Sequence, residues 1–379
     1  MGTGKGSAYK LMRFAKEVKA VLRIPRDIPR INRIVSKPTY YPELPRKSAF
    51  SRWMDNFKWL VRDRLPNNYY TSYGLDVKGF RDPGDYIPQR TFINMRNAGN
   101  QKLKMTISGD YNYIALLRDK YVFSAYLSST LGSQYVIPSR GIIDKGRFFS
   151  AAERQWLDLS ALSRLEGPWA FKVIDGECGE GIYLVAIRDG RFAASGQEYD
   201  LEGFARSILK NGRWLIQPVV EQHDALKAFG TRSVNTIRAV TSQGRSGAIS
   251  VFNAGLRLGA DAESFVDNRA MGGFGVGIEL ETGKLMRYGY QHDAFGIKAE
   301  RHPLSGIVFE GYQLPFWRET MELIRNAHRQ FYELQSIGWD VVITPTGPVL
   351  LEGNDDWEIG GPQDTYGGLK KRWSEMINV

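Results

Sequence analysis

The side chains best suited to chemistry lie near the C-terminal end of the chain. Asp340 falls within an apolar run, and a second apolar run ends in Glu352 and Asn354. The Pro- and Gly-containing turn between the two runs predicts a β-hairpin, and alternation along a strand places Glu352 and Asn354 on one face. Two carboxylates and an amide, without Cys or His, suit Mg²⁺. Because Mg²⁺ usually takes substrate phosphates as well, the pattern implies a nucleotide. The alternative is a structural acid and a turn Asn.

Composition limits the class of protein. The chain has 379 residues, enough for two or three domains, and at 42% hydrophobic and 24% charged residues it is typical of a globular protein. No run of 18 apolar residues occurs, so no transmembrane helix is expected. The single cysteine, Cys178, excludes an internal disulfide framework. With no apolar signal-peptide core at the N-terminus, these features predict a cytoplasmic protein.

Positive charge is concentrated at the N-terminal end. Residues 1–66 hold 16 Lys and Arg against 5 Asp and Glu, a net charge of +11, whereas the remaining 313 residues have a net charge of −1. The pattern predicts a basic amphipathic helix over 7–25, ended near Pro25, and then an extended stretch to Pro45. One interpretation is peripheral contact with the anionic inner membrane face. The other is an arm docked on the body with a solvated basic face. Nucleic acid is disfavoured because no reading motif accompanies the charge.

Two lysines are candidates for binding phosphate. Lys120 falls in the first turn of a predicted helix, where its charge opposes the helix dipole. Lys172 lies in a predicted strand, 169–174, that a glycine-rich loop joins to a second strand, 183–187. A loop of this kind can fold over phosphates, although the absence of a following helix excludes the P-loop and Rossmann patterns. The alternatives are a surface Lys and a plain hairpin. The loop glycines are Gly176, Gly179 and Gly181.

Two further segments carry candidate binding groups. An apolar run over 213–221 is interrupted by Pro218, which predicts an edge strand or a connector between two lobes. The backbone of such a connector can bind an adenine ring, with Gln217 receiving the exocyclic amine. Arg238 lies inside an apolar run and therefore needs an anionic partner, which is either a phosphate or carboxylate of a substrate or a structural acid.

Taken in order, these pieces resemble the ATP-grasp superfamily, and within it the branch associated with sugar-transfer genes. The resemblance covers about residues 70–370 and leaves the first 65 unmatched. The motifs that carry it are Asp119-Lys120, Asn235-Thr236-Ile237-Arg238, His302-Pro303, Pro315-Phe316-Trp317, Ile337-Gly338-Trp339-Asp340, Gly347-Pro348, Glu352-Gly353-Asn354 and Gln363.

The resemblance implies an α+β fold in which two α+β lobes clamp ATP. On this basis we expect a basic helical arm over 1–66 and a small N-terminal α/β lobe over 67–115. The lobe with the glycine loop is expected over 116–215, and the lobe with the metal site over 216–379.

The resemblance also implies roles for individual residues. Lys120 and Lys172 look like phosphate-binding lysines, and the glycine loop closes over the phosphates. One departure is that the hinge here reads Gln-Pro-Val-Val-Glu, whereas the family often has Glu before the apolar pair. The remaining assignments are Gln217, Val219, Val220 and Glu221 for adenine and ribose, and Asp340, Glu352 and Asn354 for Mg²⁺, expected as two ions.

The implied activity is that of a carboxylate–amine ligase that forms an amide through an acyl phosphate, with Arg238 and Lys172 as catalytic residues. Glu221, His302 and Asp267 are candidates for the general base. The expected substrates are an amine or amino acid and the uronic-acid carboxylate of a polysaccharide or its lipid-linked precursor. A ribosomally made peptide is the rival acceptor. A nucleotide-binding scaffold without turnover and a single-stranded nucleic-acid binder are alternatives from other classes.

Overall fold

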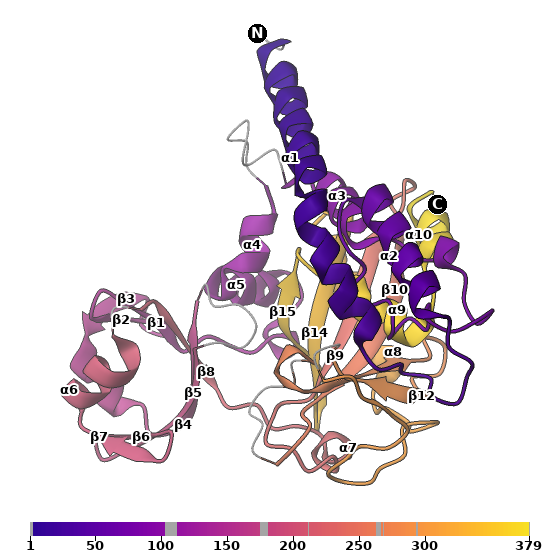
Figure 1. The fold of residues 1–379 in the computed structure, drawn as a ribbon. Coiled ribbons are helices and arrows are strands. Elements are labelled where there is room, and N and C mark those ends of the chain that lie inside the picture. Colours follow the sequence, from indigo (N-terminus) through magenta and orange to yellow (C-terminus); the bar gives the residue numbers. More distant parts are fainter. Residues whose placement is uncertain are drawn as a thin grey trace.

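A computed structural model describes residues 3–102, 112–174, 181–210, 212–262, 267, 269–292 and 295–378 of the chain. It contains two antiparallel sheets, which lie in separate parts of the molecule (Figure 1). The first has the strand order β3-β2-β1-β8-β4-β5-β6-β7. Its strands are β1 (Gly141–Asp144), β2 (Arg147–Ser150), β3 (Gln155–Asp158), β4 (Gly167–Val173), β5 (Ile182–Arg188), β6 (Arg191–Ala194), β7 (Gln197–Tyr199) and β8 (Trp214–Pro218).

The second sheet packs in a larger hydrophobic cluster than the first sheet does and carries the predicted metal hairpin at one edge. Its order is β13-β12-β11-β10-β9-β14-β15. The predicted hairpin is confirmed as β14 and β15, which pair antiparallel. The strands are β9 (Thr236–Gln243), β10 (Ile249–Leu258), β11 (Phe274–Ile278), β12 (Leu285–Tyr290), β13 (Lys298–Ala299), β14 (Ser336–Thr344) and β15 (Gly347–Asn354).

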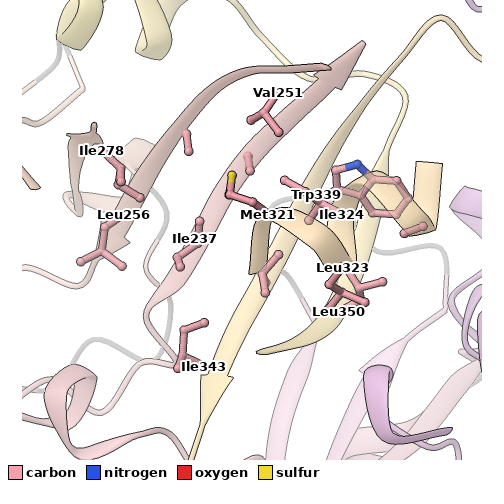
Figure 2. Packing of buried hydrophobic residues seen from close by; sticks show 14 of the residues in the cluster. Ile237, Val251, Leu256, Ile278, Met321, Leu323, Ile324, Trp339, Ile343 and Leu350 are labelled. Carbon is pink, nitrogen blue, oxygen red and sulfur yellow. The ribbon is translucent and has the colours of Figure 1, made fainter. Parts of the chain in front are cut away.

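Both faces of the second sheet are covered, because alternate residues of its strands pack in opposite directions. On one face Ile237 joins the cluster formed with helix α8, and Figure 2 shows Met321 and Ile324 of this helix among the strand residues. On the other face Val240 packs with Trp373 of helix α10. The helices are α1 (Thr3–Ser36), α2 (Ala49–Asp63), α3 (Gln89–Gly99), α4 (Ile114–Arg118), α5 (Lys120–Thr130), α6 (Leu201–Phe204), α7 (Asp224–Lys227), α8 (Trp317–Arg329), α9 (Gly360–Tyr366) and α10 (Lys370–Asn378).

The N-terminal helix is longer than the sequence predicts. Helix α1 continues to Ser36 through Pro25 and Pro29, so both the predicted end near Pro25 and the predicted extended stretch are wrong over this part. Each Pro removes one helical hydrogen bond. Beyond them Ile31 and Ile34 are buried, and Ile34 packs with Trp59 of helix α2. This tertiary packing outweighs the local penalty of the prolines.

The position of Pro218 also differs from the prediction. Strand β8 is central, because it pairs with β1 on one side and β4 on the other. Pro218 is nevertheless tolerated because it is the last residue of β8. It lies beyond Ile216, the last residue of β8 that pairs with β1. Only the residues after Pro218 form the connector to the second sheet.

The segment expected to form a small α/β lobe, 67–115, contains helix and turns. Its described residues, 67–102 and 112–115, form a short 3₁₀ turn at 83–85, helix α3 and the start of α4. Val77 of this segment forms an isolated antiparallel β-bridge with Arg46. Buried tyrosines hold the turns together, with Tyr73 stacked on Tyr86 at 4.5 Å between ring centroids. Among the described residues, no helix combines the length and apolar character needed to cross a bilayer.

A buried histidine sits between helix α8 and the second sheet. His328 Nε2 donates to the carbonyl of Leu334 at 2.8 Å, so its Nδ1 accepts from the Thr241 hydroxyl at 2.6 Å. Trp339 Nε1 in turn donates to Thr241 at 2.7 Å. Burial lowers the pKa of His328 to about 4. A second proton would turn Nδ1 into a donor and leave the hydrogen of the Thr241 hydroxyl without this acceptor, so the neutral ring fits the core.

His328 should therefore make the protein acid-sensitive. Its folded pKa lies below the unfolded value, so stability is fully present above about pH 6.5 and falls as the pH drops toward 4. Urea unfolding at pH 7 and pH 5 should show a loss about 2 kcal/mol larger for the native protein than for His328→Gln. Equal losses in the two proteins would contradict the assignment of a neutral buried ring.

Candidate active site

The three predicted metal ligands lie together on the second sheet. Asp340 of β14 is directly opposite Glu352 of β15, and Asn354 Nδ2 donates to Glu352 Oε1 at 3.3 Å. The register shifts after this pair, because Val341 faces Leu350 and leaves one residue of β15 unpaired. Such a bulge re-aims neighbouring side chains. The arrangement gathers two carboxylates and one carboxamide on one face.

Two arginines surround the buried carboxylate of Asp340. Arg238 grips it with two nitrogens, Nε on Oδ1 and Nη2 on Oδ2 at 2.9 Å, and Arg257 Nη2 approaches Oδ2 at 3.3 Å. Burial acts to raise the pKa of Asp340, but the two arginines outweigh burial and hold this pKa below its usual value. The sequence left two kinds of partner open for Arg238, an anionic group of a substrate or a structural acid. The structure shows a structural acid, Asp340.

Arg257 links this pair to a second buried acid. Its Nη2 lies 3.1 Å from Asp267 Oδ1, and its Nε donates to the Thr236 hydroxyl at 3.0 Å. Asp267 Oδ2 accepts from the Thr236 amide at 2.9 Å. Sequence reasoning missed Arg257. The rule that singled out Arg238, a charge inside an apolar strand, applies equally to Arg257 between Leu256 and Leu258 and would have found it.

Glu352 is the carboxylate that interacts electrostatically with Lys172 of the first sheet. Burial and the neighbouring Asp340 raise the pKa of Glu352. Burial likewise lowers the pKa of Lys172 on β4 to about 8, with Glu352 opposing the shift and Lys120 adding to it. These three side chains come from two sheets and one helix, and their charges are close enough to influence one another. The fold therefore brings Lys172 within electrostatic range of Glu352, and Lys120 within electrostatic range of Lys172.

Local structure fixes Lys120 at its place. Asp119 caps helix α5, because its Oδ1 accepts from the amides of Tyr121 and Val122 at 3.0 Å each. Lys120 is thus the first residue of the helix, where the dipole disfavours a positive charge. Its Nζ donates to the carbonyl of Ile174 at 3.1 Å. This contact directs the amine to the end of β4, where the glycine loop begins.

Of the three predicted loop glycines, Gly176 and Gly179 lie outside the described residues. Gly181 precedes β5 with φ +70°, and a Cβ added there would lie 2.5 Å from Val173 Cγ2. Both the backbone conformation and the space therefore require glycine at this position. The predicted arrangement of strand, glycine and strand is confirmed by the pairing of β4 with β5.

The predicted adenine hinge begins at Gln217, near the end of strand β8, and continues into the connector. Gln217 is buried and its Nε2 donates to the carbonyl of Ile137 at 3.0 Å. Val219 is exposed and Val220 is half-buried. Glu221 is exposed and pairs with Lys227 at 2.8 Å.

The general-base candidates are placed differently from one another. His302 is buried in the core, with its ring 5.4 Å from that of Phe229, and its Nε2 donates to the carbonyl of Gly259 at 2.8 Å. Asp267 belongs to the arginine network, and Glu221 lies on the surface. The network thus brings Asp267 to the carboxylate pair, whereas His302 and Glu221 have partners elsewhere.

The side chains fit a hard cation. Among the described residues, no group of three or more His, Cys, Asp or Glu could hold a metal. The set here is two carboxylates and one amide, the oxygen donors that Mg²⁺ accepts while keeping room for phosphate and water. Burial and the adjacent Asp340 raise the pKa of Glu352. A bound cation would favour the charged form of this carboxylate.

Removing one arginine from the buried ion-pair network should destabilise the protein strongly. Arg257→Met leaves Asp267 without its ion pair and removes one of the two arginines from Asp340, so unfolding in urea should lose about 3–5 kcal/mol. Arg191→Met is the control, because Arg191 and its partner Glu198 are both exposed. Its loss should stay below about 1 kcal/mol. A loss that small for Arg257→Met would show that the buried acids do not need it.

Comparison with known proteins identifies the family. Residues 106–377 match the family model described as sugar-transfer associated ATP-grasp, and a search of curated proteins gives no match. Solved structures similar to this chain include N5-carboxyaminoimidazole ribonucleotide synthetase from Thermotoga maritima (13% identity, TM-score 0.36, 67% of this chain and 48% of that chain). Another is L-amino acid ligase from Bacillus licheniformis (11%, 0.38, 69% and 46%). The chain thus spans about half the length of these structures. From the family match, the chain belongs to the sugar-transfer associated ATP-grasp family.

Proposed function

We propose that the protein is an ATP-dependent carboxylate–amine ligase. The observation that carries the proposal is the approach of Lys172 to Glu352 of the carboxylate pair. Asp340, Glu352 and Asn354 come from the second sheet, Lys172 comes from the first, and Lys120 begins helix α5, which packs on the second sheet. Oxygen ligands facing paired amines suit a magnesium-bound polyphosphate, which needs both. Family membership agrees with this assignment.

Each group has a place in the proposed nucleotide site. The three oxygen-bearing side chains hold Mg²⁺, proposed as two ions, and the two lysines bind phosphates. The backbone of Val219 and Val220, with Gln217, receives adenine, and Glu221 lies where the ribose would follow. Of the predicted loop glycines, Gly181 is assigned to the phosphate side, and Gly176 and Gly179 lie outside the described residues.

The reaction divides into two balanced steps. A substrate carboxylate oxygen attacks the γ-phosphorus of ATP, the bond to ADP breaks, and an acyl phosphate forms. The amine then attacks the acyl carbon, phosphate leaves, and the amine gives up a proton. Bound Mg²⁺ supplies charge neutralisation on the phosphates. Arg238 holds Asp340 in place and stabilises the transferring group, while Lys172 neutralises charge on the phosphate side.

The substrates we propose are an amine or amino acid and the uronic-acid carboxylate of a polysaccharide or its precursor. The family description and the basic N-terminal arm support an anionic, sugar-based acceptor. A ribosomal peptide whose leader binds the arm is the alternative acceptor. A scaffold without turnover is disfavoured because binding alone does not need two carboxylates at the phosphates.

Turnover should depend on both sides of the site. Asn354→Ala removes a metal ligand and Lys172→Ala removes a phosphate contact, so each should lower ADP release at least 100-fold in the presence of a competent substrate pair. The assay is coupled ADP detection over a panel of amines and uronic acids. Lys371→Ala, on the exposed face of α10, should be unaffected. Unchanged rates in both site variants would reject the assignments, and no ADP release by the native protein with any pair would favour the scaffold.

We propose a peripheral, cytoplasmic location in which helix α1 contacts an anionic membrane surface. Figure 1 shows the N-terminal part of α1 standing away from the body. Within helix α1, Val21 and Leu22 are exposed, at 46% and 71%, and so are Lys19, Arg23 and Arg26. An apolar strip flanked by basic residues is suited to a charged lipid interface, where each basic residue adds on the order of 1 kcal/mol.

Membrane binding should be electrostatic. Vesicles with anionic lipid should sediment the protein, neutral vesicles should not, and salt should weaken the binding. Replacing Lys19, Arg23 and Arg26 by Glu should abolish sedimentation. The matched control replaces three exposed basic residues of the other lobe, Lys145, Arg188 and Arg206, by Glu. Equal binding to both vesicle types, or equal loss in both triple variants, would contradict a membrane role for α1.

A further inference from the structure

The turn that follows the predicted metal hairpin is tied to the corner between helices α4 and α5. Asp355, the residue after Asn354, is buried, and Arg118, the last residue of α4, binds it with two nitrogens. Arg118 Nε donates to Asp355 Oδ1 at 2.8 Å, and Nη2 donates to Oδ2 at 3.0 Å. A pair with two such hydrogen bonds fixes the orientation of its members as well as their distance.

Both members of this pair lie next to groups that we assign to the nucleotide site. Asp355 directly follows Asn354, a proposed magnesium ligand. Arg118 comes two residues before Lys120, and Asp119 between them caps helix α5 with its side chain. The pair therefore joins the strand end that carries a proposed metal ligand to the helix start that carries a proposed phosphate ligand.

Helices α4 and α5 also lie directly against strand β15 (Figure 1). A Cβ added to Gly353 would lie 2.7 Å from Leu117 Cδ2 and 3.2 Å from Phe123 Cε2, so both helices touch the strand at this residue. Such an apolar contact fixes the distance between elements but does not by itself prevent them from sliding. The two hydrogen bonds of Arg118 oppose sliding, because they depend on direction.

A second acid, Asp356, shares the cations of this network. Arg118 Nη2 donates to its Oδ2 at 3.1 Å, Lys102 Nζ donates to the same oxygen at 2.7 Å, and Arg96 of helix α3 pairs with Oδ1. Although burial acts to raise the pKa of Asp356, the three cations hold this pKa below its usual value. Lys102 and Arg96 remain on the acid if Arg118 is replaced, so the turn should stay folded while its link to α4 is lost.

We propose that Arg118 is a positioning residue for nucleotide binding, which acts through Asp355 to hold Lys120 at the spacing from Asn354 that a magnesium-bound polyphosphate requires. The inference rests on the proposed function, because Lys120 and Asn354 have these roles only if the site takes ATP and Mg²⁺. Arg118 does not have to touch the nucleotide. Ligand-binding groups on separate elements lose affinity when their spacing is relaxed, since binding must then order them.

Calorimetric titration of the full chain with Mg²⁺ and the non-hydrolysable ATP analogue AMP-PNP tests the proposal. Arg118→Met removes the guanidinium and keeps most of the stem, and Asp355→Asn removes the charge that Arg118 grips. Each should weaken binding of the analogue by about tenfold or more. Arg287→Met is the matched control, because Arg287 contacts Glu300 through the same two nitrogens, at 3.2 and 2.9 Å. Its affinity should equal that of the native protein.

A double variant separates positioning from an independent effect. If Arg118 acts through Lys120, Arg118→Met combined with Lys120→Ala should bind the analogue within about twofold of Lys120→Ala alone, whereas independent losses multiply. Losses that multiply would overturn the proposal, and so would native affinity in Arg118→Met or in Asp355→Asn. These outcomes leave the proposed function intact as long as Lys120→Ala weakens binding. Native affinity in Lys120→Ala, or no binding by the native protein, would reject the phosphate assignment as well.

Discussion

Two carboxylates, Asp340 and Glu352, lie opposite each other on neighbouring strands, and the molecule must supply positive charge to keep them there. Like charges facing across a sheet are destabilising, and burial increases the penalty because it strips both groups of water. Arg238 and Arg257 neutralise Asp340 from strands β9 and β10. Glu352 is left with a raised pKa and with Lys172 across the lobes. A bound cation would favour the charged form of Glu352, in agreement with the Mg²⁺ site proposed at this face.

Other elements of the fold position the strands and the helix that carry these charged groups. Helix α8 covers the opposite side of the second sheet, so the strands that carry the charged groups are held rigidly. Asp119 begins helix α5 where Lys120 can meet the end of β4, and β4 carries Lys172. Strand β8 returns the chain through the centre of the first sheet before it crosses to the second. The first sheet thus contributes the positive charge of Lys172, and the second sheet contributes the carboxylate of Glu352.

Local pattern was sufficient for much of the fold and for the position of the site. The hairpin that bears Asp340, and the β4–β5 pair around Gly181, follow from alternation and turn residues alone. Long-range packing was not readable in this way. Helix α1 passes Pro25 because Ile34 is buried against Trp59, and β8 is central although it ends in Pro218. Nor could the sequence show that Arg238 would pair with Asp340, since their separation in the chain gives no hint of their contact.

Metal binding at the carboxylate pair is the central claim, and titration of Mn²⁺ by electron paramagnetic resonance in the presence of a non-hydrolysable ATP analogue tests it most directly. The native protein should bind the ion, and Glu352→Gln should lose at least tenfold in affinity. Glu358→Gln, which changes an exposed carboxylate four residues beyond the hairpin, should bind as the native protein does. Equal affinity in all three proteins would contradict the account.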